Sequence, residues 1–169
     1  MINLYSQLTN QGWSGYWDVN QPVHTWNGVI VTEDGCHVES LYLLFPNSIN
    51  LVLPDLSPLS YLTALDLGSN GSSSQTNYHI TGNFTSIGQL TELKTMIIYN
   101  ANFNSQVPIS FQGLTKLENL RLVNCNLNDN SQFCSVFSNL HNLVELMLDF
   151  NNYSGNLSSC INGTNLPKL

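Results

Sequence analysis

Glu145 and Asp149 are candidates for a pair of catalytic carboxylates, the arrangement that hydrolyses glycosidic bonds. Four residues apart in an extended strand, they would share one face and lie roughly 13 Å from each other. Glycosidase carboxylates lie about 5–9.5 Å apart, so the spacing does not support this chemistry. Arg121 is expected to form an ordinary surface ion pair with Glu145 or Asp149.

The four histidines do not form a pattern typical of a metal site or a nucleophilic triad. They fall in an amino-terminal segment, a hairpin, an insertion and a turn between repeats: His24, His37, His79 and His141. Both kinds of site need side chains that converge. A glycine-rich phosphate-binding loop is absent too. We therefore expect no cofactor, no metal site and no enzymatic activity.

Regularly spaced leucines define the elements that must position all other side chains. Their pairs are Leu59 and Leu62, Leu90 and Leu93, Leu114 and Leu117, Leu140 and Leu143, and Leu166 and Leu169. Val38 begins an earlier, degenerate copy, and successive copies lie 24 (38 to 62), 31 (62 to 93), 24 (93 to 117), 26 (117 to 143) and 26 (143 to 169) residues apart. Alternating apolar residues after each pair predict strands near 39–43, 63–67, 94–98, 118–122 and 144–148. No single repeat can bury its own apolar stripe, so the strands must stack into a parallel sheet.

The side chains on the inner face of these strands should form the core. They are Leu65, Leu67, Met96, Ile98, Leu120, Leu122, Leu146 and Leu148.

Two of the four cysteines hold the same position in successive repeats. Cys134 lies six residues before Leu140, and Cys160 lies six before Leu166. Adjacent strands lie roughly 4.7–4.9 Å apart, and a disulfide needs Cα atoms about 4.4–6.8 Å apart. This match predicts a Cys134–Cys160 bridge and an oxidising compartment. Cys36 and Cys125 lie more than three turns apart, so both are expected to be buried free thiols.

The pattern L-x-x-L-x-L-x-x-N/C over residues 38–169 resembles that of leucine-rich-repeat proteins. Between the strands, residues 102–117 resemble the plant-type repeat, as do residues 80–84 and 153–157 in part. The resemblance implies an α/β leucine-rich-repeat solenoid, with a curved parallel β-sheet on the concave face and 3₁₀ or irregular segments on the convex face. Asn70 and Asn151 fall where a buried amide is expected to satisfy backbone groups after the strand, a place that Cys125 takes in one copy.

Residues 1–37 resemble the amino-terminal cap of plant-type and amoebal repeats. The cap is expected to contain a short amphipathic helix over residues 2–8 and a hairpin that turns at residues 33–35. Its W-x-G-V element is Trp26-Asn27-Gly28-Val29. Family caps flank this element with a cysteine pair that is missing here, so aromatic packing should hold the cap. Its three tryptophans, Trp13, Trp17 and Trp26, are expected in the core.

Outward-facing strand positions form three columns across the predicted concave face. The middle column reads Tyr42, Asp66, Ile97, Arg121 and Met147, the next Leu44, Gly68, Tyr99, Val123 and Asp149, and the third Phe45, Ser69, Asn100, Asn124 and Phe150. A face so rich in apolar side chains either binds a ligand or is merely shielded by its own aromatics. The candidate binding residues are Tyr42, Phe45, Asp66, Ile97, Tyr99, Arg121, Met147, Asp149 and Phe150. An insertion at residues 71–77 is either a bulge on the rim or a ligand-contacting finger.

Composition and sequons favour a secreted glycoprotein. Only 9% of the residues are charged, and the net charge of −7 includes just four basic residues, which argues against nucleic acid and anionic membranes as partners. No apolar run is long enough to span a bilayer. Five N-x-S/T sequons begin at Asn70, Asn83, Asn152, Asn156 and Asn162. All except Asn70, whose amide should be buried, are expected to be accessible to N-glycans.

Two functions remain open. The first is an extracellular recognition module that binds a protein, peptide or glycan on its concave face. The second is a structural subunit that self-assembles end to end into a filament. This second function would follow if another subunit covers the repeat that begins at Leu166. No signal peptide is visible in residues 1–25, so the sequence starts after its removal or belongs to a longer chain.

Overall fold

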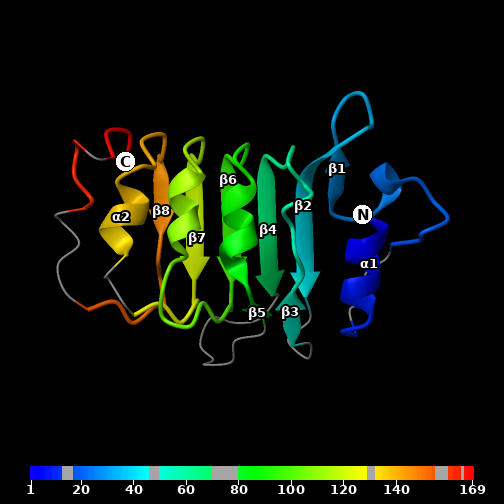
Figure 1. Ribbon diagram of the computed structural model, residues 1–169, viewed down its shortest axis with the longest axis horizontal. Coiled ribbons are helices and arrows are strands. Elements are labelled where there is room, and N and C mark those ends of the chain that lie inside the picture. Colours follow the sequence, from blue (N-terminus) through cyan, green and yellow to red (C-terminus); the bar gives the residue numbers. More distant parts are fainter. Residues whose placement is uncertain (13–16, 46–49, 70–79, 129–131, 155–159, 165) are drawn as a thin grey trace.

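One six-stranded sheet organises the molecule (Figure 1). The computed structural model describes residues 1–12, 17–45, 50–69, 80–128, 132–154, 160–164 and 166–169. In spatial order the strands are β1 (Val29–Val31), β2 (Val38–Phe45), β4 (Ala64–Ser69), β6 (Thr95–Tyr99), β7 (Asn119–Val123) and β8 (Glu145–Met147). All neighbouring pairs are parallel except β1 and β2. The five predicted strands are confirmed to within two residues at each end.

The strand register keeps the repeats in phase. Leu41, Leu65, Met96, Leu120 and Leu146 pair in succession across the sheet. The six predicted core residues of β4, β6 and β7 are completely buried. Leu146 and Leu148 pack against this core as predicted, but they are only half-buried. Within the described sheet β8 is the last strand and pairs with β7.

Short helices cover the convex face: η2 (Phe84–Gln89), η3 (Ile109–Gly113) and α2 (Phe133–Phe137). The first two are 3₁₀ helices, as the resemblance implied. They pack so closely that a Cβ on Gly88 would lie 2.4 Å from Ser110 Oγ and 2.6 Å from the Ser110 carbonyl carbon. The Ser110 hydroxyl donates a hydrogen bond of 3.0 Å to the Thr85 carbonyl of η2. Position 88 must therefore be glycine if this spacing is to be kept.

A second, two-stranded parallel sheet, β3 (Leu51–Leu53) and β5 (Ile80–Gly82), was not predicted from the sequence. An isolated bridge between Ile80 and Ala101 continues its pairing toward the next repeat. Strands of three residues contain too little alternation to be recognised in a sequence.

The amino-terminal segment packs through aromatic side chains. It contains α1 (Ile2–Thr9) and η1 (Val23–Thr25), and Leu4 and Leu8 of α1 are buried. Trp17 and Trp26 are buried and stack with ring centroids 4.9 Å apart, whereas Trp13 lies outside the described residues. The expected turn joins β1 to β2.

Gly28 of the W-x-G-V element allows β1 and β2 to approach closely. Its φ is +77°, and a Cβ there would lie 2.1 Å from the Tyr42 carbonyl oxygen. No other residue fits this position without a shift of the backbone.

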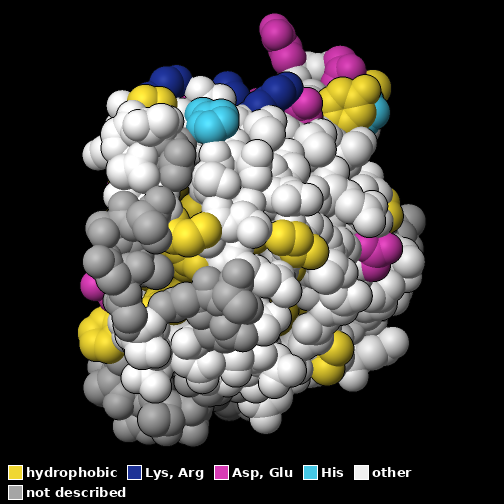
Figure 2. Space-filling view, turned by 60° about the vertical axis from the view of Figure 1, so that its left-hand side comes forward, with side chains coloured by type: hydrophobic (Ala, Val, Ile, Leu, Met, Phe, Trp, Pro, Cys, Tyr) yellow, Lys and Arg dark blue, Asp and Glu magenta, His cyan; other side chains and the backbone are white. Residues whose placement is uncertain are grey.

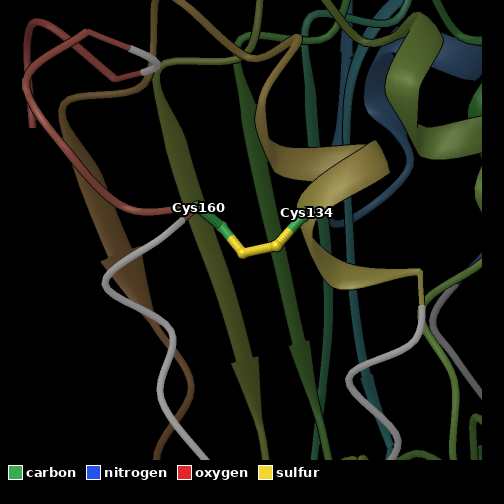
Figure 3. Close-up of a disulfide and its surroundings, with 2 residues drawn as sticks. All are labelled: Cys134 and Cys160. Atoms are coloured by element: carbon green, nitrogen blue, oxygen red, sulfur yellow. A yellow bond between two sulfur atoms is a disulfide. The ribbon is translucent and has the colours of Figure 1, made fainter.

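The predicted disulfide joins Cys134 of α2 to Cys160 (Figure 3), with the two Cα atoms 4.8 Å apart. Cys125 is a buried free thiol, as expected, and its Sγ donates to the Ile98 carbonyl at 3.4 Å. Burial raises the pKa of this thiol to about 12. Cys36, however, is exposed, so its prediction as a buried thiol was wrong. It lies in the turn between β1 and β2, outside the repeat register, where its backbone N–H donates to Asp34.

Candidate binding surface

The middle column of outward-facing residues forms a continuous row across the concave face. Strand pairing places its members side by side: Tyr42, Asp66, Ile97, Arg121 and Met147. Tyr42 and Met147, at the two ends of the row, are exposed, and the three residues between them are half-buried. We call these five residues the central row.

Arg121 pairs with Glu145 on the next strand, as predicted. Its Nε and Nη2 both donate to the carboxylate, the second at 3.2 Å from Oε2. The hydrogen bonds that Arg121 makes to Glu145 and Tyr99 raise the pKa of its guanidinium. The same pairing lowers the pKa of Glu145. Arg121 is therefore held in place and largely neutralised by its neighbours.

Asp66 is in a different electrostatic position. Its Oδ1 is buried and, within the described part of the chain, has no hydrogen-bond partner. Burial raises the pKa of this carboxyl, and the more distant charge of Arg121 only partly opposes the shift. Because water does not reach this oxygen, no hydrogen bond replaces the hydration that it loses on folding. Ionised Asp66 therefore lowers the stability of the folded state.

Neighbouring side chains close over buried Gly68 beside Asp66. A Cβ built on Gly68 would lie 3.2 Å from Leu44 Cδ2, 3.3 Å from Asp66 Oδ1 and 3.9 Å from Tyr99 Cδ2. The carboxylate oxygen, one aliphatic side chain and one aromatic ring therefore converge over this glycine. Leu44 itself is 55% exposed.

The rest of the predicted surface is only partly brought together. Tyr99 is half-buried and Val123 is buried, whereas Asp149 lies beyond the end of β8 in a turn. Phe45 pairs with Ser69 in the expected register. The insertion at residues 71–77 lies outside the described residues.

Two members of the third column, Asn100 and Asn124, do not lie on the surface, which corrects the expectation for them. Both are buried, and their φ angles are +56° and +52°. Asn124 Nδ2 donates to Asn100 Oδ1 at 2.7 Å, and Asn126 Nδ2 donates to Asn102 Oδ1 at 2.8 Å. The strand has ended at these positions, so side chains no longer alternate between faces. The sequence signal for these amide–amide hydrogen bonds was the recurrence of asparagine after 24 residues, from Asn100 to Asn124 and from Asn102 to Asn126.

Phe150 occupies the position equivalent to Asn100 and Asn124. Its φ is also +56°, a conformation that asparagine tolerates and a bulky aromatic residue rarely adopts. Its side chain is 64% exposed. An exposed aromatic ring held on a strained backbone makes Phe150 the most unusual member of the predicted surface.

Asn151 acts as its repeat position predicted. Its Oδ1 accepts from the Cys125 N–H at 2.8 Å and the Leu127 N–H at 3.2 Å. Its Nδ2 donates to the carbonyls of Leu122 and Leu148. The amide thus connects the ends of β7 and β8. The corresponding prediction for Asn70 falls outside the described residues.

Three sequon asparagines, Asn83, Asn152 and Asn162, are exposed. Asn70 and Asn156 lie outside the described residues.

Asn83 lines a polar cleft of about 340 Å³ that sequence reasoning missed. The cleft is lined by Leu53, Asp55, Ser57, Asn83, Thr85, Ser86 and Gln89. Its sequence signals were the D-x-S and N-x-T turns, in which Asp55 and Asn83 accept from the N–H two residues later.

Charged side chains are sparse, and the basic ones other than Arg121 lie at one edge. Lys94 and Lys116 lie just before β6 and β7 and Lys168 in the last turn, and Figure 2 shows dark-blue side chains along the upper edge. In the part of the chain that the structure describes, no three His, Cys, Asp or Glu side chains gather as a metal site would require. No helix among these residues is long and apolar enough to cross a membrane.

No protein-family model and no curated protein sequence matches the chain. Solved structures with the same fold do. A plant ice-binding protein matches with 19% identity and a TM-score of 0.61, over 89% of this chain and 46% of its own. The ectodomain of the receptor kinase SOBIR1 from Arabidopsis thaliana matches with 22% identity and a TM-score of 0.64, over 90% of this chain and 79% of its own.

A third similar structure is the Arabidopsis receptor kinase HAESA, solved with the peptide hormone IDA and the co-receptor SERK1. It matches with 23% identity and a TM-score of 0.51, over 80% of this chain and 26% of its own. The chain thus spans less than half the length of the ice-binding protein and about a quarter of HAESA. At these identities the likeness concerns the fold, and the fold of this chain is that of a leucine-rich-repeat solenoid.

Proposed function

We propose that this chain is an extracellular recognition module that binds a peptide or an extended protein segment along its concave face. The observation that carries the proposal is the central row, in which exposed apolar side chains flank the Arg121–Glu145 pair and Asp66. Binding energy in protein interfaces concentrates in aromatic and arginine side chains surrounded by apolar contacts. The row offers this combination on rigid strands.

The shape of the row suits an extended ligand. Its five residues lie on five adjacent strands, so a ligand crossing the strands would meet one of them roughly every 4.8 Å. Leu44 and Phe150 add exposed apolar side chains beside the row. HAESA, which shares the fold, was solved with a peptide hormone, and this supports a peptide more than a glycan.

A random peptide library displayed on phage and panned on the protein tests the proposal. Selected peptides should lose most of their affinity for a Tyr42→Ser/Met147→Ser variant, which removes two exposed side chains of the row. A Val52→Ser/Ile109→Ser variant is the matched control, because these residues are comparably exposed on β3 and η3. Peptides that bind the control and the row variant equally well would place the site elsewhere.

We also propose that the protein is a secreted glycoprotein. The Cys134–Cys160 disulfide supports an oxidising compartment, and the exposed amides of Asn83, Asn152 and Asn162 support glycan attachment. Expression through a eukaryotic secretory pathway, followed by glycopeptide mapping, tests this. Three unmodified asparagines would remove the argument from sequons. The neighbouring structures named above do not support the filament alternative.

A further inference from the structure

The geometry points to Asp66 as the residue that selects a lysine or arginine side chain in the bound peptide. This inference rests on the proposed function, because it names the ligand chemistry of the same concave face. It adds a specific charge requirement to a surface whose other exposed contacts are apolar.

Asp66 is half-buried in the middle of the central row. It is paired in register with Tyr42 on β2 and with Ile97 on β6. Beside it, the side chains of Leu44 and Tyr99 close over Gly68. The aliphatic stem of a lysine or arginine fits against such apolar walls while its charged head reaches a carboxylate. The rings of Tyr42 and Tyr99 are further partners for a cation.

The charges on this face favour a cation. Arg121 is already engaged by Glu145 and Tyr99, so Asp66, Arg121 and Glu145 together carry a net charge of −1 (one positive and two negative groups). The remaining basic residues, three lysines, lie in turns at the edge of the sheet. Neither of the two ion pairs in the described part of the chain involves Asp66.

The buried Oδ1 of Asp66 provides the driving force. A carboxylate oxygen without a donor is costly, and a ligand that supplies an N–H donor removes that cost as it binds. Leu44 is 55% exposed, so its side chain can rotate away from Gly68 and Asp66 without disturbing the core. The bound cation would then occupy the space that Leu44 vacates.

An array of nine-residue peptides tests the inference. Eight positions are randomised among uncharged residues, and the central position is lysine, arginine, norleucine or glutamate. The wild-type protein should bind the lysine and arginine sets about tenfold or more tightly than the norleucine set. Asp66→Asn should abolish this preference. Asp55→Asn, which neutralises an exposed carboxylate outside the concave sheet, should retain it.

The outcomes separate this inference from the proposed function. Equal binding of the lysine and norleucine sets, still sensitive to Tyr42→Ser, would overturn the role of Asp66 and leave the concave site standing. Binding that ignores both Tyr42→Ser and the central residue would overturn the two proposals together. The comparison between peptide sets uses the wild-type protein, so it decides the question even if Asp66→Asn does not fold.

Discussion

Strands β7 and β8 carry the same repeat but differ in what surrounds them. Leu120 and Leu122 of β7 are completely buried between two neighbouring strands, whereas Leu146 and Leu148 are half-buried beside a single one. After β7 the chain turns through buried Asn124, and after β8 it turns at the same φ through exposed Phe150. The same leucine pattern therefore contributes differently to the free energy of unfolding in the two repeats, because stability comes from the interfaces between repeats.

The largest expected effect tests this difference directly. Leu120→Ala should lower the free energy of unfolding by about 2–5 kcal/mol, because it leaves a cavity between two packed repeats. Leu146→Ala should cost markedly less, since part of that side chain already contacts water. Urea denaturation of the two variants measures both values. Equal losses would show that the half-buried leucine is packed as tightly as the buried one.

The disulfide should partly compensate for the weaker packing after β8. It closes a loop with a sequence separation of 26, so opening it should cost about 3.5 kcal/mol, mainly through the entropy of the unfolded chain. A Cys134→Ala/Cys160→Ala variant compared with the wild type by thermal unfolding measures this. Cys36→Ala is the control, because an exposed free thiol should contribute almost nothing. An unchanged melting temperature in the double variant would contradict the expectation.

Replacing Phe150 should have a smaller effect of opposite sign. Phe150→Asn should raise the free energy of unfolding by about 1 kcal/mol, because asparagine tolerates the positive φ and can extend the ladder to Asn124. Phe150→Ala removes the ring without that relief and serves as the control. If the ring contacts the ligand, as proposed, both variants should weaken peptide binding. A destabilised Phe150→Asn would show that the ring contributes more to folding than its exposure indicates.

The smallest expected effect concerns the pH dependence of Asp66. Because burial raises its pKa in the folded state, the folded protein holds this proton to higher pH than the unfolded chain. The carboxyl therefore imposes no penalty below its ordinary pKa of 3.8 and lowers stability as the pH rises through the raised value. Asp66→Asn should thus be more stable than the wild type at pH 7, with the difference vanishing near pH 3.

Asp55→Asn should show the opposite sign. Hydrogen bonds from Ser57 lower the pKa of Asp55, so any stability it adds is present above the ordinary pKa and is lost as the pH falls. Urea denaturation of both variants and the wild type at several pH values from about 3 to 7 measures how each stability difference changes with pH. A constant difference between Asp66→Asn and the wild type at all pH values would show that burial does not shift this carboxyl.

The repeat register was predictable because each inward-facing leucine is repeated several times, and a one-residue error would have turned every side chain to the wrong face. The same logic located the Cys134–Cys160 bridge and the Arg121–Glu145 pair. Both depend on equivalent positions in adjacent repeats, a property that the sequence displays directly.

The features missed from the sequence lie where that register stops. Asn100 and Asn124 follow the last strand residue, so continuing the alternation placed their buried amides on the surface. Cys36 precedes the first repeat and lies in a turn. The side chains that close over Gly68 and the buried, partnerless oxygen of Asp66 depend on packing between three strands, which spacing alone does not encode.

Gly88 sets a mechanical property of the solenoid. On the concave side the distance between repeats is fixed by backbone hydrogen bonds, but on the convex side it is fixed by how closely η2 and η3 can approach. A methyl group at position 88 would act as a wedge on one side only and would bend the arc more tightly. Through Gly88, a residue on the convex side thus sets the curvature of the concave face without altering any residue on that face.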